Sequence, residues 1–142
     1  MSRPLHMRHN FPAIEALEAG GVNLAKLTRV APGVDPERLL VREARPWFER
    51  IVLRRSAAIA LPYVVYVRSR TYVLPRADLT RLVVHELVHV SQWRADGYLR
   101  FSTRYLGDYL RLRLRGRPHI DAYLAIRYEA EARAAADEIL AG

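Results

Sequence analysis

The hydrophobic and polar positions of this chain repeat with two different periods, and each period predicts a different kind of element. Apolar residues three and four positions apart are typical of helices with one buried face. That spacing predicts helices over residues 12–19, 35–45, 47–54, 79–96 and 103–115, one or two helical turns over 22–30, and a last helix that begins near Asp121 or Ile126 and ends near Leu140.

Residues 57–75 change period. β-Branched and aromatic residues gather there in three short runs, at 58–61, 63–67 and 71–74, which is typical of strands. We predict a small antiparallel sheet of two or three strands before the helix over 79–96. The chain is therefore expected to form one mostly helical α+β domain spanning residues 1–142, with a loose segment at 1–10.

Local signals set the expected boundaries of these elements. Gly20-Gly21 ends the first helix, and Asp35-Pro36-Glu37 is a typical helix start, with Asp at the N-cap and Pro in the first turn. Asp78 is the expected N-cap of the helix over 79–96, and Gly97 its end, before a loop over 97–102. In the segment over 47–54 we expect the apolar side chains to face inward; these are Trp47, Phe48, Ile51 and Val52.

The helix over 79–96 contains His85-Glu86-Leu87-Val88-His89, a match to H-E-x-x-H. A helix turns by about 100° per residue, so the two histidines lie roughly 40° apart and leave the same face. Two neutral imidazoles at this spacing can bind one Zn2+, and Glu86 beside them can take a proton from a water bound to that metal. The neighbouring residues are apolar nearly all round, which indicates a buried helix in which unpartnered histidines would be costly.

A catalytic zinc needs a third protein ligand and one open position. The second histidine is not followed by the further histidine of the H-E-x-x-H-x-x-G-x-x-H pattern, because Ala95 stands six residues after His89. The third ligand must therefore come from another element. The downstream candidates are His119, Asp121, Glu129, Glu131, Asp137 and Glu138.

The residues around the histidines, 82–93, together with Ile126-Arg127-Tyr128-Glu129-Ala130-Glu131-Ala132-Arg133, resemble the minimal gluzincin-type zinc metallopeptidases. The resemblance covers residues 57–136 and is greatest to small bacterial domains of contractile-injection-system and polymorphic-toxin proteins. In those domains H-E-x-x-H-V-x-Q is followed by a segment like I-P-[FY]-E-x-E-A, whose first Glu completes a His/His/Glu site. The resemblance implies a zincin-like fold and a zinc metalloendopeptidase.

Carried over by position, the resemblance makes His85, His89 and Glu129 the zinc ligands and Glu86 the general base for a zinc-activated water. Glu131 is the competing third ligand. It lies about 200° from Glu129 around a helix, so both cannot reach one metal. Arg133 stands where other gluzincins have an Asp that orients a ligating histidine, which leaves that supporting role to Asp108, Asp121 or a backbone carbonyl.

The remaining catalytic roles stay open at the level of sequence. The oxyanion of the transition state needs a hydrogen-bond donor, for which Tyr128 and His119 are our candidates, with Tyr105 and Tyr123 as alternatives. We expect the strand over 63–67 to align an extended peptide substrate by β-augmentation. Two alternative functions are a metal-binding structural or cargo module with weak or no peptidase activity, and a basic nucleic-acid-binding domain.

The composition of the chain limits the chemistry and the kinds of partner that we expect. The chain has no cysteine, which excludes disulfides and thiol chemistry. Its net charge of +8 comes from 22 arginines and one lysine that are scattered along the sequence, so a nucleic-acid partner is possible but not favoured. No long apolar run or signal peptide is visible. We therefore expect a cytoplasmic protein with a peptide or protein substrate and no membrane partner, possibly within a larger assembly or exported by a specialised system.

Overall fold

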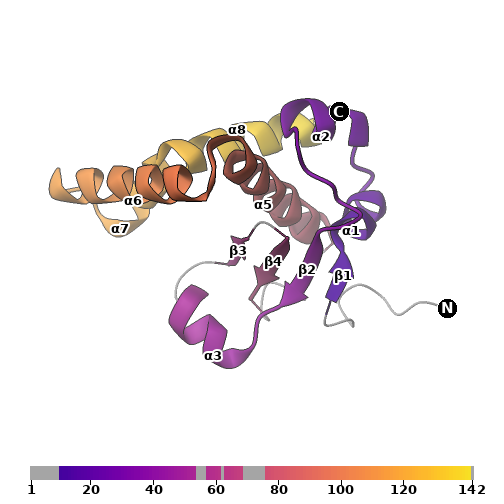
Figure 1. The fold of residues 1–142 in the computed structure, drawn as a ribbon, viewed down its shortest axis with the longest axis horizontal. Helices are drawn as coiled ribbons and strands as arrows, with labels where there is room; N and C mark the ends of the chain where they lie inside the picture. The colour runs from indigo at the N-terminus through magenta and orange to yellow at the C-terminus, as the bar shows by residue number, and fades with distance from the viewer. Residues whose placement is uncertain (1–9, 54–56, 62, 69–75, 142) are drawn as a thin grey trace.

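A computed structural model of the chain describes residues 10–53, 57–61, 63–68 and 76–141. Over these residues the chain is α+β and mostly helical, as predicted (Figure 1). The strands are β1 (Asn10–Pro12), β2 (Leu40–Glu43), β3 (Ala58–Ala60) and β4 (Val64–Val67). The helices are α1 (Ala13–Ala19), α2 (Leu24–Val30), α3 (Pro46–Phe48), which continues into a π-helical turn η2 (Glu49–Leu53), α5 (Arg76–Asp96), α6 (Tyr98–Leu114), α7 (His119–Ala125) and α8 (Arg127–Leu140).

The four strands form one mixed sheet in the order β1-β2-β4-β3. Antiparallel pairing of β3 with β4 agrees with the predicted antiparallel sheet, but β2 pairs with β4 in parallel. The prediction of a purely antiparallel sheet from residues 57–75 alone was therefore wrong. The two missing partners, β1 and β2, come from sequence far upstream of that segment, and the third predicted strand, 71–74, lies outside the described residues.

The predicted helix over 35–45 is also wrong, although its first turn forms. The Asp35 side chain accepts a hydrogen bond from the Glu37 amide at 3.1 Å, and the Asp35 carbonyl accepts one from the Leu39 amide. The chain then becomes extended at Leu40, because β1 and β4 take up hydrogen bonds on both edges of this segment. Tertiary pairing of a short β-prone run, with Val41 fully buried, overrides the helix-start signal.

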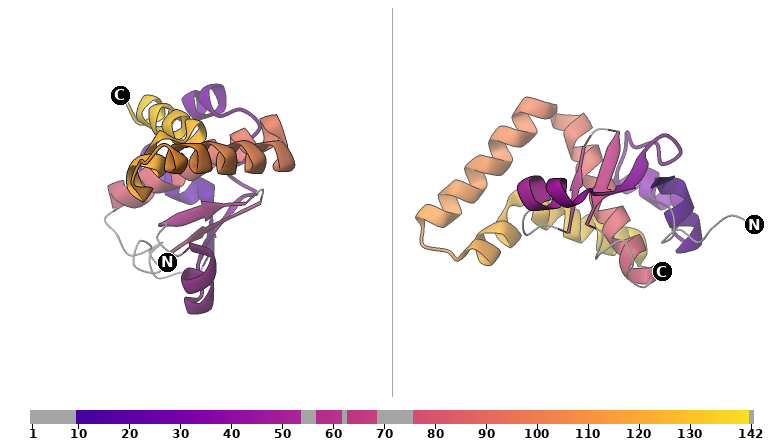
Figure 2. Two further views of the ribbon diagram at one scale, coloured as in Figure 1. Left: turned by 90° about the vertical axis from the view of Figure 1, so that its left-hand side faces the viewer. Right: turned by 90° about the horizontal axis from the view of Figure 1, so that it is seen from below.

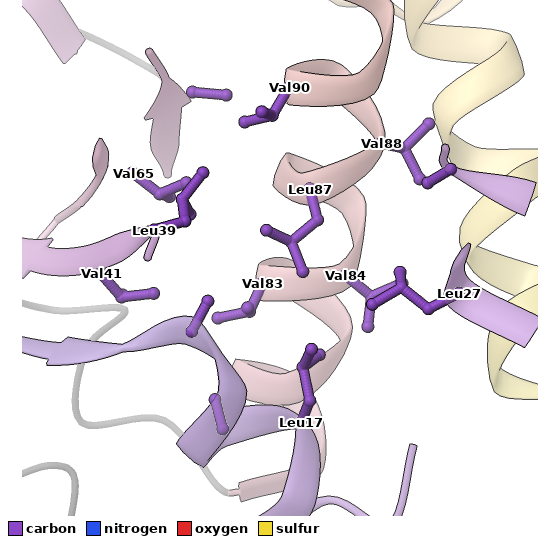
Figure 3. Packing of buried hydrophobic residues seen from close by; sticks show 14 of the residues in the cluster. Leu17, Leu27, Leu39, Val41, Val65, Val83, Val84, Leu87, Val88 and Val90 are labelled. Carbon is purple, nitrogen blue, oxygen red and sulfur yellow. The ribbon is translucent and has the colours of Figure 1, made fainter. Parts of the chain in front are cut away.

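Helix α5 is the centre of the core and is apolar on both sides, as the sequence indicates. Figure 3 shows Val83, Leu87 and Val90 pointing toward the sheet, while Val84 and Val88 point to the opposite side. There α8 lies along α5 and α1 packs near its beginning (Figure 1). Because α5 has no solvent face along this stretch, its polar residues enter the core with it.

The chain turns sharply at Gly97, where φ is +81°, and α6 begins at Tyr98 without an intervening loop. The expected loop over 97–102 is thus the first turn of a helix, and residues 103–115 are its continuation. Helix α6 runs away from the sheet, and α7 and α8 bring the chain back to α5 (Figure 2). Ile126, with extended backbone, separates α7 from α8, so of the two predicted starts of the last helix the one near Ile126 is confirmed, and Asp121 lies in the separate helix α7.

Of the other expectations for the fold, some are confirmed and some are wrong. The helices over 12–19 and 22–30 form as α1 and α2. Helix α5 begins at Arg76, so Asp78 lies in its first turn and is not the N-cap. Trp47 is exposed instead of inward-facing, while Phe48 packs on Tyr66 with ring centroids 4.6 Å apart. The side chains of Ile51 and Val52, and residues 1–9, lie outside the described part of the chain. No helix in that part is long and apolar enough to cross a bilayer.

The contact between α1 and α5 predicts the effect of a substitution at Gly20. A methyl group there would lie within 2.9 Å of Cβ of Thr80, a buried residue of α5 whose hydroxyl donates to the Ala16 carbonyl. We expect Gly20→Ala to lower the free energy of unfolding by about 1–3 kcal/mol through overpacking, measured by urea denaturation.

The matched control is Gly107→Ala within α6, where an added methyl group meets no atom within 4 Å. This variant should be about 0.5–1 kcal/mol more stable than the parent, because alanine is the better helix former. Equal effects of the two substitutions would show that the α1–α5 contact is not tightly packed.

Candidate metal centre

Four side chains of the predicted site meet between α5 and α8. His85, Glu86 and His89 project from the middle of α5, and Glu129 from the first turn of α8. Oxygens of Glu129 lie 3.0 Å from Nε2 of His85 and 3.1 Å from Nε2 of His89, and the two Nε2 atoms are 3.2 Å apart. Glu86, His89 and Glu129 are buried, so this cluster is part of the protein interior.

These separations fit a bound metal ion. An ion about 2.1 Å from each of three ligands at tetrahedral angles would hold the ligand atoms about 3.4 Å apart. The observed separations of 3.0–3.2 Å are only slightly smaller, with Oε2 of Glu129 next to His85 and Oε1 next to His89. The ligand atoms of His85, Glu86 and His89 also lie within 4.8 Å of one another. The cluster could therefore hold a metal ion with little rearrangement.

Gln92 fixes the orientation of His89. Its side-chain nitrogen donates to the Tyr128 carbonyl at 3.0 Å, and since a carbonyl can only accept, the amide oxygen must face His89. That oxygen lies 2.8 Å from Nδ1 of His89, which is consequently the protonated nitrogen. Nε2 is left pointing into the cluster, where it can carry either a proton or a metal.

Charge coupling within the cluster shifts the pKa of both partners. Burial would lower the pKa of His89, but its hydrogen bond to Glu129 and the nearby Glu86 carboxylate outweigh burial and raise it to about 9. Burial would likewise raise the pKa of Glu129, yet the hydrogen bonds from His85 and His89 hold it well below its usual range. Without metal, an imidazolium at His89 therefore faces a carboxylate at Glu129.

Glu86 differs from Glu129 in its surroundings. Burial raises its pKa, and the two histidines only partly offset this, so its carboxylate is the more basic of the two. Glu86 lines a cavity of about 420 Å³ that the side chains of His89 and Glu129 also reach. Much of the remaining wall is apolar, formed by Leu53, Ile59, Trp93, Phe101 and Leu106. A polar end and an apolar wall suit a ligand with both kinds of surface.

Two tyrosines line the same cavity. The Tyr105 hydroxyl donates to Oε1 of Glu129 at 2.7 Å, which holds the carboxylate toward the histidines. Tyr123 comes from α7 and also lines the cavity. Burial and the negative charge of Glu129 raise the pKa of both phenols, so both keep their protons at neutral pH and can donate hydrogen bonds.

Strand β3 forms one wall of the cavity and is at the edge of the sheet. Its ladder with β4 uses Ala57, Ile59 and Leu61, so the peptide groups of Ala58 and Ala60 point to the open side. The Ala60 carbonyl accepts a hydrogen bond from the Trp93 ring nitrogen at 3.1 Å. The predicted substrate-aligning strand, residues 63–67, is instead β4, whose two edges are occupied by β2 and β3.

The two candidate oxyanion donors lie elsewhere. The Tyr128 hydroxyl donates to Asp96, while its ring packs on Phe101 at a centroid distance of 4.4 Å. His119 is hydrogen bonded to the Tyr109 hydroxyl at 2.8 Å. Neither residue is among those that line the cavity. The structure therefore does not bring Tyr128 or His119 to the cluster, because their hydroxyl and ring nitrogen are held by other partners.

The other candidate ligands Asp121, Asp137 and Glu138 are exposed, and Asp137 pairs with Arg81. Glu131 is exposed on α8, so Glu129 and not Glu131 reaches the histidines. Arg133 donates to the Leu124 carbonyl, and Asp108 pairs with Arg111. Sequence reasoning missed Gln92 as the orienting partner of His89. Its position three residues after His89, within reach on a helix, was the available signal.

No protein-family model, curated protein or solved structure matches this chain. The resemblance to the gluzincin-type peptidases therefore stays a prediction from the motif.

The link from His89 through Gln92 to the Tyr128 carbonyl predicts that Gln92→Leu weakens metal binding. Without Gln92, the His89 ring loses the acceptor that orients it, and the Tyr128 carbonyl loses its donor. We expect metal affinity to fall by about 10- to 100-fold, measured by competition with a chromophoric chelator. Arg94→Ala, an exposed position two residues along α5, should bind as the parent does. Unchanged affinity in Gln92→Leu would exclude the orienting role.

The raised pKa of His89 predicts how the metal-free protein responds to pH. A pKa raised from 6.5 to about 9 contributes stability that is fully present below pH 6.5 and lost as the pH rises through 9. The loss can reach about 3 kcal/mol, at about 1.4 kcal/mol per pKa unit. Urea unfolding of chelator-treated protein at a series of pH values between these limits measures it.

His89→Gln should lack most of this pH dependence, and a slope equal to that of the parent would contradict the assignment. Metal affinity should move the other way and increase with pH up to about 9, because the ion must displace the proton from Nε2.

Proposed function

We propose that this chain is a zinc-dependent metallopeptidase. The observation that carries the proposal is the meeting of His85 and His89 from α5 with Glu129 from α8, beside a buried Glu86, at the wall of a cavity. Two histidines and one carboxylate are the ligand set of one class of catalytic zinc site. The motif resemblance to gluzincin-type peptidases with a zincin-like fold supports the same conclusion.

Each residue of the cluster has a distinct role in this proposal. His85, His89 and Glu129 would hold Zn2+ through Nε2, Nε2 and a carboxylate oxygen, with Gln92 and Tyr105 fixing the orientation of two of them. When bound, the zinc polarises the scissile carbonyl and lowers the pKa of a water molecule. A bound cation would replace the Nε2 proton of the His89 imidazolium and keep the buried Glu129 carboxylate paired with a positive charge.

Glu86 is the proposed general base. Its carboxylate lines the cavity, is not needed as a ligand, and has a pKa raised by burial, which brings it nearer the range in which a carboxylate accepts a proton efficiently. It would take the proton of the attacking water and pass it to the leaving amine. A purely structural metal site would have no use for a buried carboxylate at this position.

Substrate would lie between β3 and the cluster. The outward peptide groups of Ala58 on β3 can pair with an extended peptide, and the apolar wall can bury one of its side chains. Tyr105 and Tyr123 are both candidate oxyanion donors, since both line the cavity, interact with Glu129 and keep their protons.

Metal content and activity of one set of variants test the proposal. Elemental analysis of the purified parent should find about one zinc per chain. His85→Ala and Glu129→Ala should lose it, because each removes one of three ligands. The parent should cleave an unfolded protein such as casein, and Glu86→Gln should keep its metal but lose activity by a factor of about 100 or more.

Glu131→Ala is the matched control, since Glu131 is a second glutamate on α8 but is exposed. It should retain both metal and activity. A parent that binds no metal even when zinc is supplied would overturn the proposal. A parent that binds zinc but has no Glu86-dependent activity on any unfolded substrate would leave a metal-binding module in its place.

A further inference from the structure

Helix α6 carries a row of exposed leucines on its outer side. Leu99, Leu106, Leu110 and Leu114 form this leucine stripe, and at about 100° per residue they fall within one sector of the helix. Leu106 is 56% exposed, Leu110 50% and Leu114 88%. Near the start of α7, Ile120 adds a further exposed apolar side chain at 59%.

The stripe is not the packing face of the helix. The opposite side of α6 carries Phe101 and Leu112, which are buried, and Tyr105, which contacts Glu129 in the metal centre. Helix α6 thus has a packed inner face and an exposed apolar outer face, which meet at Leu106. An exposed apolar patch of this kind on a folded domain marks a contact surface.

Arginines surround the stripe at its far end. The sequence from Leu110 to Ile120 contains four arginines and no acidic residue. All four are exposed; Arg111 pairs with Asp108, and Arg113 donates a hydrogen bond to the Arg117 carbonyl. Their alternate spacing places Arg111 and Arg113 on opposite flanks of the stripe instead of on one face. The end of α6 and the start of α7 lie at one extremity of the molecule (Figures 1 and 2), so this tip combines leucine with cationic side chains.

We propose that the α6–α7 tip, residues 110–120, binds the surface of an anionic lipid bilayer. Leu110 and Leu114 would enter the boundary between headgroups and acyl chains. Arg113, Arg115 and Arg117 would reach the phosphates, with their aliphatic stems along the apolar layer. The expectation of no membrane partner depended on the lack of a spanning segment, which does not bear on surface binding.

Charge and shape favour a bilayer over two other occupants. A second copy of the chain would bring the same arginines together across a two-fold interface, and their repulsion opposes it. A helix from another protein packs best into a groove, whereas leucines that are half or more exposed stand out from the surface. A fluid bilayer accommodates such protruding side chains.

The proposal does not depend on the peptidase reaction, but binding to a bilayer would determine where the cavity lies relative to the lipid surface. Leu106 belongs both to the leucine stripe and to the cavity wall beside Glu86. Binding through the tip would therefore bring the cavity close to the lipid surface, where the accessible substrates are membrane proteins and peptides at the interface.

Sedimentation with lipid vesicles tests the proposal on the full chain. Vesicles of phosphatidylcholine with one-third phosphatidylglycerol should bind the parent at low salt, and vesicles of phosphatidylcholine alone should bind it much more weakly. The double variant Leu110→Ser/Leu114→Ser should lower the partition coefficient by about tenfold or more, since two apolar side chains no longer leave water. Arg115→Gln/Arg117→Gln should lower it by a similar factor.

The control variant is Tyr63→Ser, which removes an exposed apolar side chain at a distant position and should bind as the parent does. Circular dichroism and metal content of every variant establish that the fold is kept. Equal binding of parent and leucine variant would overturn the proposal. Loss in the arginine variant alone, together with leucine-independent binding to a DNA duplex, would identify a polyanion surface instead. Failure of the parent to bind anionic vesicles at low salt would also overturn it.

Discussion

The packing of the structure depends on ionisable side chains that are buried between helices α5 and α8. Helix α5 is buried on both sides, so His89 and Glu86 cannot reach bulk water, and Glu129 enters the same space from α8. Burying such groups is costly unless each is paired. The histidines pair with Glu129, Gln92 orients His89, and Tyr105 holds Glu129, and these contacts determine how α5, α6 and α8 pack. An aromatic cluster around Phe101 packs next to them, with the Phe101 ring 6.2 Å from that of His89.

Much of the centre could be predicted because its signals are local. The spacing of His85 and His89 within one helix fixes their shared face, and the all-round apolar surface of α5 indicates burial. Among the downstream candidates, Glu129 is singled out only by the resemblance, since no rule of spacing connects it with a helix forty residues away. The choice between Glu129 and Glu131 needed the packing of α8 on α5, which buries one carboxylate and exposes the other.

The errors have a common cause in long-range pairing. Residues 40–43 follow a good helix start, yet pairing with β1 and β4 makes them a strand. Tyr128 and His119 are polar groups near the site in sequence, but Asp96 and Tyr109 hold them elsewhere. In each instance the local pattern was consistent with two conformations or partners. Contacts from distant segments decided between them, and sequence spacing alone carries no information on those contacts.

Because the centre is divided between α5 and α8, its residues become available at different times during synthesis of the chain. Synthesis proceeds from the N-terminus, so His85, Glu86 and His89 leave the ribosome well before Glu129. Until α8 has emerged and docked, the nascent chain has two of the three side chains of the triangle and lacks the Tyr128 carbonyl that anchors Gln92. The centre therefore cannot assemble before α8 has been synthesised and has docked on α5.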